Sequence, residues 1–268
     1  ARLVAEFAHP GGNLLSARLL EAKADNGVPL LLIDCPAYYV RAGSAYLDGA
    51  GNDFADNHLR FGLLSRIAAL LAGGTSPLRW HPDVLHCNDW PCGLAPAYLH
   101  FMEGATASTV MSIHNLAFQG IFPADTLEAL GLPAAAYAID GVEYWGELSF
   151  MKAGLHYAQR ITTVSPRYAE EIQTEAFGYG FAGLLRWRNR DLTGIPNGID
   201  TRAWDPAADT YLPRRYEFAH MKGKDANKAA LRQRLGLAQE SSCPLFGAVS
   251  RITHQKGLDL LADIGEEI

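Results

Sequence analysis

The sequence predicts an α/β fold built on a parallel β-sheet. Two observations indicate this class: short β-branched runs are continuously apolar rather than alternating, and longer helical stretches separate them. Continuously apolar strands are typical of sheets buried on both faces, and strands that alternate with helices form parallel βαβ units. We therefore expect a parallel sheet that helices cover on both faces.

The expected elements follow one another along the chain. Short apolar runs predict strands at residues 28–34, 83–86, 109–113, 160–164, 192–195 and 244–250. The stretches between them predict helices at residues 56–71, 93–102, 144–159, 166–177, 226–235 and 257–268. Ser165-Pro166 begins the fourth of these helices, because serine is a favoured N-cap and proline fits the first helical turn.

A change in amino-acid composition divides the chain. Residues 197–242 are polar and punctuated by Asn-Gly, Asp-Pro and Leu-Pro pairs, so we expect a connector between domains at 1–196 and 243–268. A single strand and helix cannot bury their own surfaces. We therefore expect the chain to be the first part of a longer two-domain protein. The first clear strand starts at residue 28 without a preceding glycine loop, so we also expect the first strand of the domain to be missing.

Composition excludes several classes of protein. The 268 residues carry a net charge of -6, which disfavours a nucleic-acid binder. The basic run at 186–190 is expected to be a solvated helix face. No apolar stretch reaches the roughly 18 residues of a membrane-spanning helix, and no signal pattern is visible. Four cysteines do not make a disulfide scaffold at this length, so we expect a soluble protein of a reducing compartment.

Polar residues stand directly after the expected strands. Asn88 and Asp89 follow one strand, and His114 and Asn115 follow the next. Later strands are followed by Ser165, Asn197 and Arg251. Ligands of parallel α/β sheets bind beyond the carboxyl ends of the strands, so we expect these side chains to converge on one cleft. The alternative is helix capping, which explains Asn88, Asp89 and Ser165 equally well when each is taken singly.

Three residues suggest chemistry at this cleft. His114 stands between a buried strand and an aromatic loop closed by Gly120, which suits a pocket wall, although a lone histidine is often structural. Arg251 closes an expected strand and Lys256 begins the next helix. Both cations could point at an anion on that helix N-terminus, such as a diphosphate leaving group. The alternative is a pair of surface cations.

Two further patterns are set aside. Residues 178–183 match the dinucleotide fingerprint G-x-G-x-x-G, but a helix is expected before them where the fingerprint needs a strand. A nicotinamide-dependent oxidoreductase would require a strand immediately before Gly178. A metal cluster would have to use His81, His86, Cys87 and Cys92. Its spacing lacks a second ligand pair, and Cys35 and Cys243 stand in buried strand contexts, so buried structural cysteines are expected.

Six segments carry a resemblance to a known family. They are HCNDWPCGLAPA at 86–97, SIHNLAFQG at 112–120, FMKAGL at 150–155, TVSP at 163–166, PNGID at 196–200 and SRITHQKGLD at 250–259. In this order they resemble bacterial glycogen synthases and plant starch synthases along nearly the whole chain. The resemblance implies a GT-B fold, with two Rossmann-like domains across a cleft. It also implies transfer of glucose from ADP-glucose to the 4-hydroxyl of an α-1,4-glucan, with retention at the anomeric carbon and without a metal or other cofactor.

The resemblance also implies roles for individual residues. His114 matches the histidine that contacts the donor glucose near its 6-hydroxyl, and Asn115 follows in the same loop. Asp89 matches an aspartate of the same cleft wall. Asn197 matches an asparagine near the donor. The donor diphosphate is expected to bind Arg251 and Lys256.

The sequence departs from the family pattern at three places. The N-terminal K-x-G-G-L loop and the C-terminal glutamate motif are absent, so we expect the 268-residue chain alone to be inactive. Phe54 stands near a position where relatives often carry tyrosine. Two alternatives stay open: a non-catalytic glucan-binding protein of the same fold, and a glycosyltransferase that uses UDP-glucose. The expected location is the bacterial cytoplasm, or the plastid for a plant protein.

Overall fold

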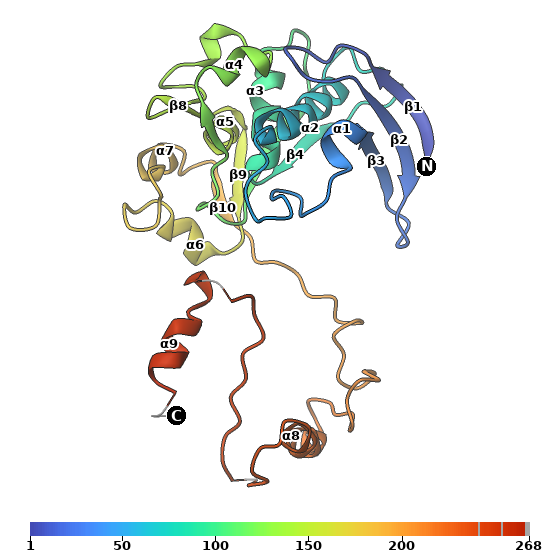
Figure 1. Ribbon diagram of the computed structural model, residues 1–268, viewed down its shortest axis with the longest axis vertical. Helices are drawn as coiled ribbons and strands as arrows, with labels where there is room; N and C mark the ends of the chain where they lie inside the picture. The colour runs from blue at the N-terminus through green and yellow to red at the C-terminus, as the bar shows by residue number, and fades with distance from the viewer. Residues whose placement is uncertain (241, 253, 266–268) are drawn as a thin grey trace. The chain divides into compact units, whose positions relative to one another are not determined.

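The computed structural model describes residues 1–240, 242–252 and 254–265, and the chain forms two compact units that meet between Asn197 and Gly198 (Figure 1). The strands are β1 (Arg2–Phe7), β2 (Ala17–Lys23), β3 (Pro29–Asp34), β4 (Val84–Asn88), β5 (Ser108–Ile113), β6 (Ile121–Pro123), β7 (Glu143–Tyr144), β8 (Glu147–Ser149), β9 (Arg160–Thr163) and β10 (Leu192–Gly194). The helices are α1 (Pro36–Tyr39), α2 (Asn57–Ala72), α3 (Leu94–His100), α4 (Thr126–Ala129), α5 (Phe150–Tyr157), α6 (Pro166–Glu171), α7 (Ala182–Trp187), α8 (Lys222–Arg234) and α9 (Leu258–Asp263). The 3₁₀ turns are η1 (Trp90–Cys92), η2 (Ala134–Ala136) and η3 (His254–Lys256).

A four-stranded parallel sheet organises the first unit. Its strand order is β10-β9-β5-β4, and all three pairings are parallel. The strands predicted at 83–86, 109–113, 160–164 and 192–195 are therefore confirmed. The α/β class is confirmed with them, because the apolar strands alternate with helices as the sequence indicates.

Helices cover one face of this sheet. The crossovers from β4 to β10 all step in the same direction, so α3, α5 and α7 lie on the same side, as Figure 1 shows. There Met111 and Ile161 of the strands pack against Leu155 of α5 and Leu185 of α7. On the other face the described residues include a polar row, which hydrogen bonds join: His86, Ser112 and Thr162. The sequence predicts helices on both faces of the sheet, whereas among the described residues they cover one face.

The first strands differ from the prediction. The segment 28–34 does form a strand, but β3 belongs to an antiparallel sheet β1-β2-β3 and is half exposed rather than buried. The first strand begins at Arg2 and not at residue 28. One face of this sheet is covered by α2, where Leu19 packs against Leu63 and Ile67, and such one-sided packing is typical of antiparallel sheets.

Some helix boundaries also differ. The helix predicted at 144–159 begins at Phe150, because the hairpin β7–β8 occupies its first residues. The helix predicted at 166–177 ends at Glu171. The helix predicted at 226–235 begins earlier, at Lys222. The helix predicted at 257–268 is α9, which ends at Asp263, and residues 266–268 lie outside the described residues.

The strand predicted at 244–250 is not formed. These residues are irregular, and the described part of the second unit offers them no strand as a partner. A strand needs neighbours to satisfy its backbone groups, so an apolar run alone does not suffice. Cys243 is accordingly exposed rather than buried, whereas Cys35 is buried as predicted.

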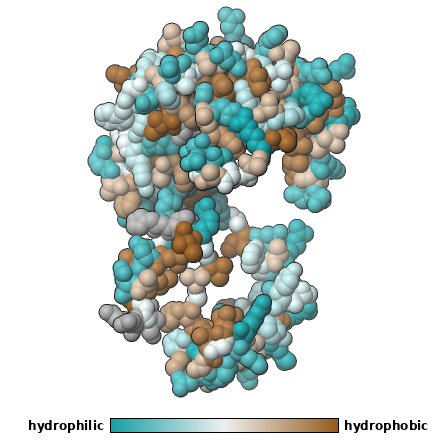
Figure 2. All heavy atoms as spheres, viewed as in Figure 1, coloured by the Kyte–Doolittle hydropathy of each residue, from teal (hydrophilic) through white to brown (hydrophobic). Residues whose placement is uncertain are grey.

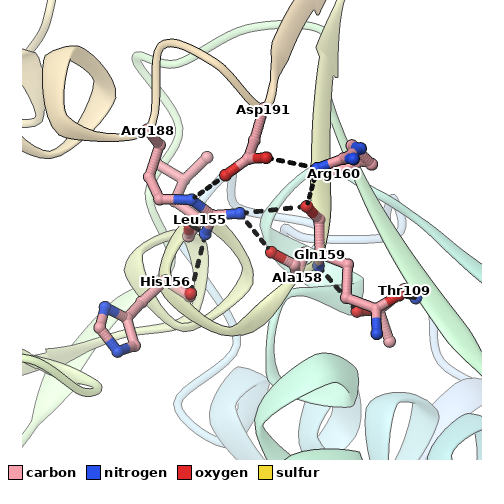
Figure 3. Close-up of polar contacts among 8 residues, drawn as sticks. All are labelled: Thr109, Leu155, His156, Ala158, Gln159, Arg160, Arg188 and Asp191. Carbon is pink, nitrogen blue, oxygen red and sulfur yellow. Dashed lines mark hydrogen bonds and ion pairs between the residues drawn. The ribbon is translucent and has the colours of Figure 1, made fainter.

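Arg188 corrects the expectation that the basic run is a solvated helix face. Its side chain is buried and ties α7 to the end of α5 (Figure 3). The guanidinium donates hydrogen bonds to the carbonyl groups of Leu155, His156, Ala158 and Gln159. Asp191 accepts a further bond from Arg188 and also pairs with Arg160. Arg188 therefore satisfies carbonyls that a helix C-terminus leaves without partners.

The second unit has little buried surface. Among its described residues, only Gly223 and Arg232 are buried. Large apolar side chains such as Phe218 and Phe246 are exposed, and Figure 2 shows hydrophobic residues at the surface around α8 and α9. The division into 1–196, 197–242 and 243–268 stays a prediction. No helix in the described ranges is both long and apolar enough to span a membrane.

Candidate functional site

The parallel pairing of β4 and β5 brings two of the predicted polar pairs together. Asp89 Oδ1 accepts hydrogen bonds from the backbone N–H of His114, at 2.8 Å, and of Asn115, at 3.4 Å. The Nε2–H of His114 donates to Asn88 Oδ1 at 3.0 Å. His114 is exposed at this edge, whereas Asp89 and Asn115 are half-buried. At this edge of the sheet, the side chain of Asn88 thus holds the His114 imidazole, and the carboxylate of Asp89 holds the His114 backbone.

The backbone of Asp89 is strained. Its φ of 55° and ψ of −178° approach a region that is almost restricted to glycine and costs about 1–3 kcal/mol for other residues. Its side chain makes no capping bond to η1, the turn that it precedes. The capping interpretation therefore fails for Asp89, because the carboxylate serves the neighbouring strand end. Strain of this kind persists where the surrounding structure determines it, and it clusters at functional sites.

The loop from His114 to Gly120 is fixed at several points. Asn115 Oδ1 accepts from the N–H of Ala117 at 3.1 Å, and the Tyr168 hydroxyl accepts from the N–H of Leu116 at 3.2 Å. Gly120 has a φ of 57°, and a Cβ there would lie 2.3 Å from the Trp90 ring. Only glycine fits this close approach. The loop therefore closes onto Trp90 and holds His114 in one place.

Ser165 is a helix cap. Its hydroxyl accepts from the N–H of Tyr168 at 3.2 Å and begins α6, with Pro166 in the first turn. The capping prediction is confirmed. The same cap positions Tyr168, whose pKa is raised by burial, so that its hydroxyl stays neutral beside Leu116.

A cavity of about 450 Å³ opens beside the same loop. Its walls include the aromatic rings of Phe54 and Phe118 and the polar side chains of Asp53, Asn57 and Gln119. Aromatic faces with a few amide and carboxylate groups suit a ligand that is both hydroxylated and ring-shaped. Phe54 supplies a ring without a hydroxyl at this wall.

The remaining predicted residues lie elsewhere along the chain. Asn197 is exposed, three residues beyond the end of β10. Arg251 and Lys256 are exposed in the second unit. Arg251 does not follow a strand, while Lys256 ends η3, and Gly257 with a φ of 63° leads from it into α9. The meeting of these three residues with His114 stays a prediction.

Neither of the two patterns set aside forms its site. The residues before Gly178 form turns after α6, so the strand that a nicotinamide site requires is absent and that hypothesis is wrong. In the described part of the chain no three His, Cys, Asp or Glu side chains could hold a metal ion. Burial raises the pKa of the Cys87 thiol to about 12 and also raises that of Cys92, so neither is a ready thiolate ligand.

Sequence reasoning missed some residues of this arrangement. From the sequence, Asn88 is only a polar residue after a strand, whereas in the structure it is the partner of His114. The signal that could have found it is the strand register, which pairs Asn88 with Ser112. Tyr168 had no such signal, because it reaches Leu116 across 52 positions of the chain.

Comparisons with known proteins agree with this architecture. Residues 3–187 match the family model described as the starch synthase catalytic domain. The chain is 52% identical to the glycogen synthase of Nitrosomonas eutropha over 95% of its own length and 51% of the relative's. It is 53% identical to that of Aromatoleum aromaticum over all of its own length and 54% of the relative's. The chain thus spans about half the length of the curated relatives it matches.

A solved structure gives the same result. The catalytic domain of starch synthase IV from Arabidopsis thaliana, bound to ADP and acarbose, matches with a TM-score of 0.78 and 29% identity. The match covers 93% of this chain and 51% of that one. Fold and site therefore define an α/β chain of the GT-B class. More particularly, the chain belongs to the starch synthase catalytic domain family.

Proposed function

We propose that the protein containing this chain is a glucosyltransferase that elongates an α-1,4-glucan. Glucose passes from ADP-glucose to the glucan's terminal 4-hydroxyl with retention at the anomeric carbon. Family membership and the relatives named glycogen synthase support this function. The solved relative, bound to ADP and acarbose, supports a nucleotide-activated donor and a glucan acceptor. The observation that carries the proposal is the exposed imidazole of His114, which Asn88 and Asp89 hold at the carboxyl edge of the sheet.

The first unit supplies the sugar side of the reaction. His114 contacts the donor glucose near its 6-hydroxyl, and the bond to Asn88 fixes which way the ring faces. Asp89 holds the backbone of His114 and Asn115 and lines the same wall. Because positioning within about 0.5 Å decides catalytic geometry, the strained Asp89 and the closed loop are useful here.

The second unit, together with Asn197 at its boundary with the first, supplies the phosphate side. Arg251 and Lys256 bind the donor diphosphate, and Asn197 lies near the donor. In the transfer, the bond from the anomeric carbon to the phosphate oxygen breaks and a bond to the acceptor 4-oxygen forms. The acceptor proton passes to the departing phosphate. Two cations stabilise the negative charge that develops on ADP, which is where preorganised charge contributes most to rate.

The test uses the full-length protein with ADP-[14C]glucose and glycogen. We expect label to enter the polymer with the wild type. In His114→Ala the rate of incorporation should fall at least about a hundredfold, because the donor sugar loses the side chain that positions it. UDP-[14C]glucose labels the polymer poorly. Absence of label with ADP-glucose, together with binding to glycogen, would establish the non-catalytic glucan-binding alternative instead. The 268-residue chain alone is expected to transfer no label.

The proposal extends to organisation and location. The first domain comprises residues 1–196, the connector 197–242, and the start of the nucleotide-binding domain 243–268. The named relatives are bacterial glycogen synthases, which supports a cytoplasmic bacterial enzyme.

A further inference from the structure

Two surface turns of the first unit share an unusual construction. In the hairpin β7–β8, Tyr144 pairs with Glu147 across the two-residue loop Trp145-Gly146, whose φ angles are 55° and 85°. In the second turn, Tyr179-Gly180 has φ angles of 46° and 86°. The N–H of Phe181 closes that turn on the carbonyl of Gly178 at 2.7 Å. Each turn therefore places an aromatic residue and a glycine at two consecutive positions with positive φ.

The first position of such a turn is unfavourable for an aromatic residue. Turns with positive φ at both central residues favour Asn-Gly, Asp-Gly and Gly-Gly, because a bulky side chain is strained there. Burial does not compensate the strain: Trp145 is 81% exposed and Tyr179 is 50% exposed. Two exposed aromatic rings on strained backbone contribute little to folding. The combination indicates a surface role for the rings themselves.

The two turns are adjacent and share one set of anchors. The carbonyl of Tyr179 accepts from the Tyr144 hydroxyl and from Gln119 Nε2, both at 2.7 Å. A Cβ on Gly180 would lie 2.1 Å from the Tyr144 hydroxyl and 3.7 Å from Trp145 Nε1. Their flanking elements, β8 and α7, lie on the same side of the first unit (Figure 1). Two glycines of the 178–183 motif, Gly178 and Gly180, therefore serve this packed double turn.

We propose that Trp145 and Tyr179 form a stacking platform for an α-glucan chain. Indole and phenol rings present flat apolar faces with a polar rim, and the C–H faces of glucopyranose rings stack on such surfaces. The platform continues the candidate site, because Gln119 anchors it and belongs to the loop that carries His114 and Asn115. The choice of an α-glucan as ligand rests on the function proposed above.

The surrounding charges favour a neutral ligand. Glu147 flanks the Trp145 turn and is exposed, whereas Glu143 accepts from the N–H of Gly146 at 2.7 Å and pairs with Lys152 Nζ at 3.8 Å. The exposed carboxylate of Glu147 repels a nucleic acid or an anionic membrane surface. A glucan carries no charge and offers hydroxyl groups to this carboxylate.

The test replaces the rings and keeps the turns. In the full-length protein, Trp145→Asn and Tyr179→Asn place the residue that such turns prefer at each position, so the melting temperature should hold or rise. Binding is measured without donor, as the retardation of the protein in native gels that contain glycogen. We expect the double variant to bind glycogen about tenfold more weakly and each single variant about threefold. The KM for glycogen should rise in parallel, while the KM for ADP-glucose stays within about twofold.

Trp80→Asn is the matched control, because Trp80 is also a largely exposed indole of the first unit but stands before β4. It should bind glycogen as the wild type does. Wild-type retardation of both single variants and the double variant, or no retardation of the wild type, would overturn the platform. If the platform variants lose retardation and the wild type transfers no glucose, the platform would be supported and the proposed transferase refuted. Loss caused equally by the control would overturn the assignment to Trp145 and Tyr179.

Discussion

Arg188 is the side chain whose removal should damage the first unit most clearly. Replacing it by methionine keeps an unbranched apolar stem, shortens the side chain and removes every donor. Four carbonyl groups then lose a hydrogen bond, at donor–acceptor distances of 2.8, 2.9, 2.6 and 3.3 Å, and among the described residues only that of Gln159 keeps a second one, from Arg160. They lie in the last turn of α5 and the link to β9, which the Arg188 guanidinium holds together (Figure 3).

The expected cost follows from burial. A hydrogen bond that involves a charged group contributes about 1.5–3 kcal/mol, but such bonds are not additive when they share one donor group. Removing the one partner of a buried network costs about 3–5 kcal/mol in total. We therefore expect Arg188→Met to lower the free energy of unfolding of this region by about 4 kcal/mol. Arg188→Lys should lose less of this free energy, because an ammonium keeps the charge and some donors. It should still lose part of it, because an ammonium cannot bridge the same four carbonyls.

The assay is hydrogen–deuterium exchange of the full-length protein, resolved by mass spectrometry on peptides from α5 and β9. It reports local unfolding and so avoids assuming that a multidomain chain unfolds in one step. Arg186→Met is the control, because Arg186 pairs with Glu175 at the surface and should contribute less than about 1 kcal/mol. Equal protection in the Arg188→Met and Arg186→Met variants would refute the reasoning.

Three further predictions concern neighbouring features. The bond from Arg188 lowers the pKa of Asp191 below its usual 3.8. The stabilisation from this pair is therefore complete above pH 3.8 and is lost as the pH falls further. In Asp191→Asn, the free energy of unfolding should fall less between neutral and acidic pH than it does in the wild type. Ser165→Ala should lower stability by about 1 kcal/mol in thermal unfolding, whereas Ser165→Asp should not, because only alanine removes the cap. Asp89→Ala should lower kcat/KM for ADP-glucose by about a hundredfold with little change in melting temperature, since it releases the backbone of His114; unchanged kinetics would contradict the role given to Asp89.

The sequence predicted the parallel sheet well because continuous apolar runs and the helices between them carry that pattern locally. The prediction failed where the local sequence does not determine the secondary structure. Residues 244–250 have the composition of a strand, but pairing needs a neighbour that composition cannot supply. Residues 144–149 look helical until Trp145-Gly146 turns the chain into a hairpin, because a tryptophan is not a usual turn signal.

The candidate site shows the same division. Strand ends predicted that Asp89 and His114 would lie at one edge, since parallel neighbours end together. The sequence could not show that the Asp89 carboxylate binds backbone N–H groups, because that follows from its strained φ and ψ. Nor could it show that Arg188 is buried, since a run of arginines looks solvated until its partners are known.

The most direct measurement is a crystal structure of the full-length protein with ADP bound. The proposed function predicts that side-chain nitrogens of Arg251 and Lys256 lie about 2.7–2.9 Å from phosphate oxygens. It also predicts that the His114 imidazole faces the same diphosphate across the cleft. Phosphates bound by other residues, with His114 turned away from them, would contradict it.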